Sequence, residues 1–389
     1  MILKEISKAF AEKILAEAKT KELTSPKANY FYLKKALDYR LNLLVEHFPK
    51  NTLHAIAVKT NNHPKVLKHI ADRGFGLEAA SIEEVKLAQN AGIPTNKIVF
   101  DSPVKTRSEI DYCHNNLSGA LVNVNCLEEI KRYPKEFSCK LGLRINPLID
   151  VNTDKSLNVS KLNSKFGVPL NKREEIFKVL TESDQFTAVH FHIGSGISDF
   201  KPNLKAYKLL TEFIEEINEE RKKNGISNSI DTLDIGGGID FEMEKNNGLE
   251  DFTKKLSKLT KNNDIKIVTE FGKFIHEKNS FVSSSVEYVT KNTSDSHNAF
   301  IHVGADLFLR KVYSSMKIEY PFAVVGKEGP KQNYRIVGPL CFAGDVLYES
   351  IQLPILNEGD EVIIFNTGAN TYSMWSRHCS RENINFIFL

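Results

Sequence analysis

No apolar stretch of the 389-residue chain approaches the roughly 20 residues that a membrane-spanning helix needs. Residues 1–19 (MILKEISKAFAEKILAEAK) are charged throughout, and Ile6, Phe10, Ile14 and Leu15 fall on one side of a helix. This pattern predicts an amphipathic helix, whereas a secretory signal would need an uninterrupted apolar core. We therefore expect neither a membrane protein nor an exported one.

Cysteine is scarce, and its spacing has no regularity. The chain has five cysteines with no CxxC pair, namely Cys113, Cys126, Cys139, Cys341 and Cys379. An odd number without motif spacing predicts neither a disulfide framework nor a zinc site, and we expect no metal. These cysteines suit the reducing cytoplasm.

An excess of one charge is also missing. The 52 basic and 49 acidic residues leave a formal charge of +3, so there is no electrostatic case for binding nucleic acid or a membrane surface. Hydrophobic residues make up 41% and charged residues 26%, as in ordinary globular proteins. Because 389 residues exceed the usual size of one core, we expect a large domain and a smaller one.

The chain does contain a regular series of short apolar runs, each followed by a polar residue or glycine. In order, these are LHAIAV before Lys59, GFGL before Glu78, KIVF before Asp101, GALVNV before Asn125, CKLGL before Arg144, TAVHF before His192, DTLDI before Gly236, Gly237 and Gly238, and IKIVT before Glu270. Stretches that can hold a helix lie between them, such as residues 63–72, 81–92 and 203–223. This alternation predicts a (β/α)8 barrel, an α/β fold whose active site lies at the rim formed by the carboxyl ends of the strands.

The pattern changes on either side of the barrel. Residues 33–48 have helical spacing and supply an eighth helix. After Glu270, short β-branched or aromatic runs alternate with Gly, Pro, Asn and Asp, at residues 281–290, 299–303, 318–325, 334–337, 361–365 and 384–389. They predict a C-terminal antiparallel β domain. We place the barrel at residues 30–277 and the β domain at 278–389, with residues 1–29 packed on the β domain or capping the barrel.

Two rim features point to an anionic ligand bound next to an amine. Lys59 ends an apolar strand, where desolvation would lower its pKa and favour a Schiff base, although a lysine that begins a loop is common. The glycines Gly236, Gly237 and Gly238 let backbone N–H groups approach a phosphate, or they simply make a tight turn. Ser195, within HFHIGSG, adds a further donor of that type.

Two other rim residues leave a structural and a functional interpretation open. His192 alternates with His190 on one strand, so one imidazole points inward, either as a core residue or as part of the site. Glu270 ends a buried strand and needs a partner, which is either a protonated pyridine nitrogen or Arg144. Ser81 and Glu84 have the spacing of a helix capping box, a structural role.

Nine segments in this order resemble the pyridoxal-phosphate decarboxylases of the alanine-racemase-like fold (fold type III), which include diaminopimelate, ornithine and arginine decarboxylases. They are AVKTN, GLEAAS, LRINP, SKFGV, HFHIGSG, LDIGGG, TEFGK, GPLCFAGD and TGANTYSMWS, and they extend over nearly the whole chain. The resemblance implies pyridoxal 5'-phosphate as cofactor and an amino acid as substrate. It also implies loss of the α-carboxylate as CO₂ through an external aldimine and a quinonoid.

The resemblance assigns a role to each barrel residue. Lys59 carries the Schiff base, His192 stacks on the cofactor ring, and Glu270 keeps the pyridine nitrogen protonated. A carboxylate at that nitrogen favours decarboxylation, because an alanine racemase of this fold has an arginine there. The remaining cofactor residues are Ser195, Gly236, Gly237, Gly238 and Gly272, together with Arg144, Lys273 and Asn370.

The β domain completes the site in the same resemblance. Cys341, the proton donor, and Asp345, a substrate residue, are presented across the interface of a homodimer with shared active sites. Arg310 and Tyr313 remain from an Arg-Pro-x-x-Tyr run of diaminopimelate enzymes and suggest a carboxylate at the far end of the substrate.

Three departures from the family pattern concern the cofactor and the substrate. Lys273 stands where the family has an arginine, and Asn370 stands where it has a tyrosine. Phe342 replaces the acidic residue that binds a distal ammonium, unless another acid such as Glu349 or Glu382 takes that place.

These departures predict a substrate that is a diamino-acid derivative with a distal carboxylate or acyl group, from a specialised pathway such as siderophore or antibiotic synthesis. The alternative is a diaminopimelate decarboxylase of lysine biosynthesis. A non-catalytic regulator is disfavoured because Lys59, Glu270, Cys341 and Asp345 are all present. A single-barrel cofactor carrier is disfavoured by the β domain. The polar cluster at residues 377–381 receives no role.

Overall fold

The computed structural model describes residues 5–153, 157–240, 243, 247–260, 264–293, 295–314 and 316–389. The chain divides into two compact units, which we call the barrel unit (Asn42–Phe274) and the β unit (Met1–Leu41 with Ile275–Leu389). The barrel unit thus begins at Asn42, whereas the boundary predicted from the sequence was residue 30. The difference arises because residues 28–32 form a strand that pairs with strands of the β unit.

The barrel unit contains a closed sheet of parallel strands. The barrel strands are β2 (Leu53–Ala57), β3 (Gly76–Ala79), β4 (Ile98–Phe100), β5 (Leu121–Val124), β6 (Lys140–Asn146), β8 (Phe186–His190), β9 (Thr232–Asp234) and β10 (Lys266–Thr269). They pair in the order β5-β4-β3-β2-β10-β9-β8-β6, and pairing of β5 with β6 closes the barrel. All eight predicted strands are confirmed, and a two-residue strand that was not predicted, β7 (Val168–Pro169), pairs with β6.

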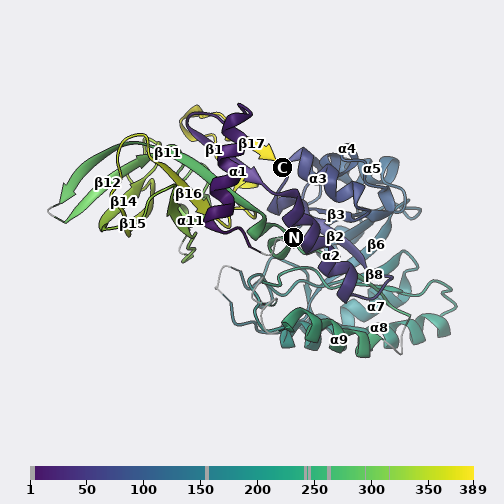
Figure 1. Ribbon diagram of the computed structural model, residues 1–389. Coiled ribbons are helices and arrows are strands. Elements are labelled where there is room, and N and C mark those ends of the chain that lie inside the picture. The colour runs from purple at the N-terminus through teal and green to yellow at the C-terminus, as the bar shows by residue number, and fades with distance from the viewer. Residues whose placement is uncertain are drawn as a thin grey trace. The chain divides into compact units, whose positions relative to one another are not determined.

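Helices follow the barrel strands, as the alternation in the sequence predicts (Figure 1). They are α3 (Pro64–Asp72), α4 (Ile82–Asn90), α5 (Arg107–Asn116), α6 (Leu127–Ile130), α7 (Arg173–Glu182), α8 (Lys201–Lys223) and α9 (Gly248–Thr260), while α2 (Lys34–His47) precedes β2. Helix α4 begins where predicted, because the Ser81 hydroxyl accepts a hydrogen bond from the Glu84 backbone N–H at 3.2 Å. The Glu84 carboxylate in turn accepts from the Ala80 N–H at 2.7 Å.

The barrel interior changes character along its axis. One cluster of buried apolar side chains comes from strands on all sides and consists of Ala55, Val99, Leu121, Ala188 and Val268. Nearer the carboxyl ends, His190 on β8 lies in register with Arg144 on β6 and Asp234 on β9, and all three are buried. The apolar layer therefore supports a polar layer at the rim.

The β unit is built on one mixed sheet. Its strands are β1 (Ala28–Tyr32), β11 (Ser280–Thr293), β12 (Ser296–Ile301), β13 (Phe322–Val324), β14 (Lys331–Val337), β15 (Val346–Pro354), β16 (Glu361–Phe365) and β17 (Asn385–Phe388). Most pairings are antiparallel, as predicted, but β12 with β14 and β1 with β17 are parallel. Strands β1 and β15 were not among the predicted strands. Two short helices, α10 (Lys273–His276) and α11 (Leu309–Tyr313), complete the elements that follow the barrel.

The amphipathic segment near the N-terminus forms helix α1 (Lys8–Thr20), which is capped by the Ser7 hydroxyl. Its buried residues Ala11, Leu15 and Ala18 pack with Phe31, Phe281, Ile363, Phe365 and Ile387 of the β unit. In the described part of the chain, every helix is too short or too polar to cross a bilayer.

Candidate active site

Charged side chains gather at the rim of the barrel, each supplied by the end of a strand. They are Lys59 in the short turn Val58–Thr60 after β2, Glu78 in β3, Asp101 after β4, Arg144 in β6, His190 in β8 and Glu270 after β10. All except Lys59 are buried, and the Lys59 side chain is 50% exposed. The rim therefore presents one accessible amine above a buried layer of acids and bases.

Lys59 is held as a cation by the acids around it. Its Nζ donates a hydrogen bond to Glu78 Oε2. Desolvation alone would lower the pKa of Lys59, but Glu78, Glu270 and Asp101 together outweigh it and raise the pKa above its usual value. The lowered pKa predicted from the sequence is wrong, since that prediction took account of burial and not of the carboxylates.

Arg144 and Glu270 do not form the structural pair that the sequence left open. Arg144 Nη1 donates to Asp101 Oδ2 at 3.0 Å. Glu270 Oε1 has no hydrogen-bond partner among the described residues. Burial raises the pKa of Glu270 well above its usual value, and the neighbouring Asp234, Asp101 and Glu78 raise it further. Glu270 is thus a buried carboxyl group that a cationic ligand would stabilise.

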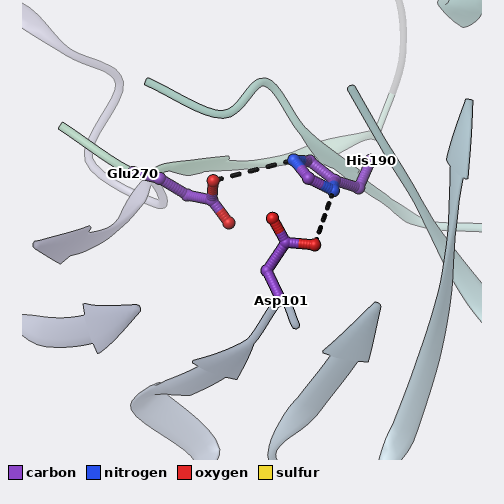
Figure 2. A group of neighbouring side chains, drawn as sticks. All are labelled: Asp101, His190 and Glu270. Carbon is purple, nitrogen blue, oxygen red and sulfur yellow. Dashed lines mark ion pairs between the residues drawn. The ribbon is translucent and has the colours of Figure 1, made fainter. Parts of the chain in front are cut away.

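The two histidines of HFHIGSG lie in different surroundings. His190 is fully buried inside the barrel, where Figure 2 shows its ring between Asp101 and Glu270. His192 is partly exposed, and its Nδ1 accepts a hydrogen bond from the Gly237 N–H at 3.0 Å. Burial, helped by the cations Arg144 and Lys59, holds the pKa of His192 well below its usual value. His192 is therefore a neutral ring with its orientation fixed by the glycine turn.

The glycine turn after β9 packs too tightly for any other residue. A Cβ on Gly237 would lie 2.3 Å from the Glu270 carbonyl oxygen, and one on Gly238 would lie 1.9 Å from the Gly194 carbonyl oxygen. Gly236 and Gly238 have φ of 63° and 98°, in the left-handed region that favours glycine. The two segments predicted to bind phosphate, around Gly194 and Gly238, are therefore direct neighbours.

Other predicted cofactor residues surround this turn. Ser195 follows Gly194, and its N–H donates to the Leu157 carbonyl at 3.2 Å. A Cβ on Gly272 would lie 2.3 Å from Thr60 Cγ2, so Gly272 lets the segment after β10 pack against the turn that carries Lys59. Lys273 Nζ donates to Asp240 Oδ2 at 2.6 Å.

In the β unit, two of the predicted substrate residues pair with each other. Tyr313, at the end of α11, stacks on Phe342 with ring centroids 5.1 Å apart and an angle of 18° between the planes. Both rings are exposed, as is Cys341, the neighbour of Phe342. Arg310, on the same helix, has its pKa lowered by burial. Asn370 has φ of 57°, a conformation that asparagine tolerates better than most residues.

Asp345 lies buried beneath the loop that carries Cys341. Its Oδ1 accepts from the Ala305 N–H at 2.5 Å, and its Oδ2 accepts from the Leu340 N–H at 2.7 Å. The carboxylate fits between Gly304 and Gly338, where a Cβ would approach it to 2.1 Å and 2.3 Å. In this chain Asp345 braces the loop through its backbone, and its predicted contact with substrate stays a prediction.

From the sequence, Glu78 and Asp101 were predicted to follow barrel strands and His190 to share a strand with His192, but none of the three had an assigned role. Their position at the ends of buried strands was the available signal, because a barrel brings all such ends to one rim. Within the described residues, Asp101, His190 and Glu270 also form the one group with spacing suited to a metal ion.

We expect Gly238→Ala to weaken binding of an anion at this turn and to destabilise the barrel. The added methyl group meets both a left-handed φ, which costs about 1–2 kcal/mol, and the Gly194 carbonyl oxygen, which adds roughly 1–3 kcal/mol of overpacking. Gly225→Ala is the matched control, since Gly225 has φ of 76° with nothing within 4 Å. Equal losses of unfolding free energy in the two variants would contradict the proposed close packing.

Comparison with known proteins places this geometry in a family. Residues 35–277, more than half of the chain, match the family model "Pyridoxal-dependent decarboxylase, pyridoxal binding domain". The diaminopimelate decarboxylase of Aquifex aeolicus is 28% identical over an alignment of 365 residues that covers 90% of this chain and 84% of that protein. The counterpart from Campylobacter jejuni is 26% identical and covers 92% of this chain and 88% of its own length.

Solved structures agree with this assignment. Diaminopimelate decarboxylase from Helicobacter pylori, complexed with L-lysine, superposes with a TM-score of 0.85 at 26% identity, covering 95% of this chain and 93% of that one. A lysine/ornithine decarboxylase from Vibrio vulnificus, at 21% identity and a TM-score of 0.80 over 97% of this chain and 98% of that one, shares the fold. The chain belongs to the family of pyridoxal-dependent decarboxylases, carboxy-lyases that act on amino acids with pyridoxal 5'-phosphate as cofactor.

Proposed function

We propose that this protein releases the α-carboxylate of diaminopimelate as CO₂. The observation that carries the reaction type is Glu270, a buried carboxyl group at the rim whose Oε1 has no hydrogen-bond partner among the described residues. A protonated pyridine nitrogen is the partner that such a group lacks, and decarboxylation depends on keeping that nitrogen protonated. The relatives named diaminopimelate decarboxylase support the choice of substrate.

The residues of the rim fit the cofactor. Lys59 would hold its aldehyde carbon covalently, Glu270 its ring nitrogen, and the neutral His192 ring one of its faces. The turn at Gly236–Gly238, which has room for backbone only, would take the phosphate. When bound, the cofactor supplies a ring that takes up the electron pair left at Cα by the departing CO₂.

The first proton transfer takes place between Lys59 and Glu78. Lys59 must lose a proton before its amine can react, and its hydrogen-bond acceptor is Glu78. Burial raises the pKa of Glu78, against the effect of Lys59 itself, so Glu78 is suited to receive that proton. Transfer of the proton from Lys59 to Glu78 therefore gives a neutral amine and leaves the net charge of the buried layer unchanged.

We assign the last proton transfer to Cys341. The thiol is exposed on a loop that Asp345 holds in shape, so it is available to a second copy of the chain. The proposal thus includes a homodimer in which Cys341 of one chain protonates the product at Cα in the other. All five cysteines are free thiols, which suits an enzyme of the cytoplasm.

Recognition of the far end of the substrate is assigned to the β unit. Arg310 can pair with the distal carboxylate of diaminopimelate, with Tyr313 on the same helix beside it. The stack of Tyr313 on Phe342 favours a second candidate, a diamino acid whose distal nitrogen is acylated or carboxylated. An aromatic surface gives a distal ammonium no acidic partner, whereas it suits a flat, uncharged acyl group.

Release of CO₂ by the cofactor-loaded protein tests the proposal. The panel comprises meso-diaminopimelate, lysine, ornithine, arginine, and acylated or carboxylated diamino acids. We expect diaminopimelate to be turned over with the highest kcat/KM and to rescue growth of a lysine auxotroph. Turnover of an acylated substrate alone, together with a gain of diamino-acid activity in Phe342→Glu, would replace it by the second candidate.

A further inference from the structure

His190 is a buried rim residue to which the proposed chemistry gives no task. It ends β8 inside the barrel and has no exposed surface. Its neighbours in register are Arg144 on β6 and Asp234 on β9. Burial of a titratable ring so deep in the barrel costs free energy unless the charged groups around it interact with the ring.

Each ring nitrogen of His190 faces a different carboxyl group. Nδ1 lies 3.4 Å from Asp101 Oδ1, and Nε2 lies 3.6 Å from Glu270 Oε2 (Figure 2). Asp101 is held on its other oxygen by Arg144 at 3.0 Å. His190 therefore connects a fixed acid to the carboxyl group that would face the cofactor.

A metal ion is a poorer match to this arrangement than a proton. The three side chains offer ligand atoms within 4.8 Å of one another. However, a single ion binds only one nitrogen of an imidazole, and here the two nitrogens face different acids (Figure 2). Asp101 also uses Oδ2 for Arg144. A proton on Nε2 would point toward Glu270 Oε2 without displacing any contact, because neither ring nitrogen of His190 has a hydrogen-bond partner among the described residues.

The balance of charge in the buried layer at the rim also favours a proton on His190. The buried acids of this layer are Glu78, Asp101, Asp234 and Glu270, and its cations before any proton transfer are Lys59 and Arg144. With every acid ionised, two negative charges would remain without a cation, an expensive state inside a barrel. A protonated His190 offsets one of them, and the protonated ring nitrogen of the cofactor offsets the other.

We propose that His190 is a positioning residue: Asp101 anchors its Nδ1, and its Nε2 holds a proton toward Oε2 of Glu270, which keeps Glu270 ionised and oriented toward the cofactor. Burial acts to raise the pKa of Asp101, but Arg144 and His190 outweigh it and lower that pKa, which agrees with the contact between Asp101 and the His190 ring. The pKa of Glu270 is raised by burial and by Asp234, Asp101 and Glu78, so a cation beside Glu270 would oppose that shift. The inference rests on the cofactor and is independent of which amino acid is the substrate.

Two substitutions of His190 separate its effect on the orientation of Glu270 from the effect of its positive charge. The amide of His190→Gln can reach toward Glu270 as Nε2 does, whereas that of His190→Asn can reach only toward Asp101. Neither amide can carry a positive charge. His54→Gln is the control, since His54 is a buried histidine of β2 whose Nδ1 lies 2.8 Å from Thr269 Oγ1 and which belongs to no part of the proposed site.

The readouts are the Kd of pyridoxal phosphate for the cofactor-free protein across pH and the absorption spectrum of the bound cofactor. We expect His190→Asn to weaken binding about tenfold or more near neutral pH, with part of the loss restored in His190→Gln. In both variants the pH of half-maximal affinity should move upward, because Glu270 loses the cation that keeps it ionised. His54→Gln should leave that pH unchanged.

Two results would overturn the proposal. One is a wild-type Kd and pH midpoint in both His190 variants, and the other is tight binding of Mn²⁺ by the cofactor-free protein that His190→Gln abolishes. If neither variant folds, Glu270→Gln protein labelled with ¹⁵N-histidine decides. Relative to the wild type, the ring-nitrogen signals of one histidine other than His192 must change in Glu270→Gln. An unchanged spectrum would reject the contact of His190 with Glu270. Because no substrate enters these measurements, their outcome is separate from that of the CO₂ assay.

Discussion

Lys59→Ala is expected to lower CO₂ release from the cofactor-loaded protein by at least about 10³-fold, since no other amine can replace the lost nucleophile. Lys59 is the charged rim residue whose side chain is half exposed, and its Nζ contacts Glu78. Its loss also removes the cation that offsets Glu78, Glu270 and Asp101. The measurement is kcat with the preferred substrate, together with the absorption band of the covalently held cofactor.

Lys59→Arg is the control that separates these two effects. Arginine keeps the positive charge above Glu78 but has no amine that can react with the cofactor. We expect cofactor affinity to be partly retained in Lys59→Arg and lower in Lys59→Ala, while both lack activity and the band. Substantial activity in either variant would contradict the assignment of Lys59.

Glu270→Gln is expected to reduce kcat by about 10²–10³-fold, because an amide cannot keep the ring nitrogen of the cofactor protonated. Glu84→Gln is a suitable control, as Glu84 is a partly buried glutamate that caps α4 and has no place in the proposed site. A Glu270→Gln enzyme with nearly normal kcat would show that the ring nitrogen needs no carboxylate.

The same substitution should have the opposite effect on the cofactor-free protein. Glu270 has a raised pKa in the folded chain, so its contribution to stability is complete below the unfolded pKa of roughly 4.3 and is lost as the pH rises through the folded value. Glutamine cannot ionise and avoids that loss. We therefore expect cofactor-free Glu270→Gln to exceed the wild type in thermal stability at pH 8, with a smaller difference at pH 5.

The barrel strands were predictable because each one is an apolar run that ends in a rim residue. Two strands of the β unit lacked such a signal. Strand β15 is largely exposed or half-buried, so its sequence shows no regular apolar alternation. Strand β1 is buried along its whole length, and nothing local distinguishes it from the start of a barrel.

At the rim, the residue types were predictable but their pairing was not. Arg144 on β6 and Asp101 after β4 come from strands that are separated by β5, so their contact depends on the three-dimensional arrangement of the barrel and not on the local sequence. That pair leaves Glu270 without Arg144. The charge on Lys59 likewise depends on three acids from other strands. The expected burial of Lys59 alone therefore could not predict its raised pKa.

The position of β1 has a consequence for how the protein is made. Residues 28–32 pair with β11 and β17, so this early segment finds its partners only after residues 280–284 and 385–388 have been synthesised. The barrel unit, residues 42–274, can fold on the ribosome in the meantime. Until then Tyr30, Phe31 and Tyr32, which are fully buried in the folded protein, lack the strands that cover them.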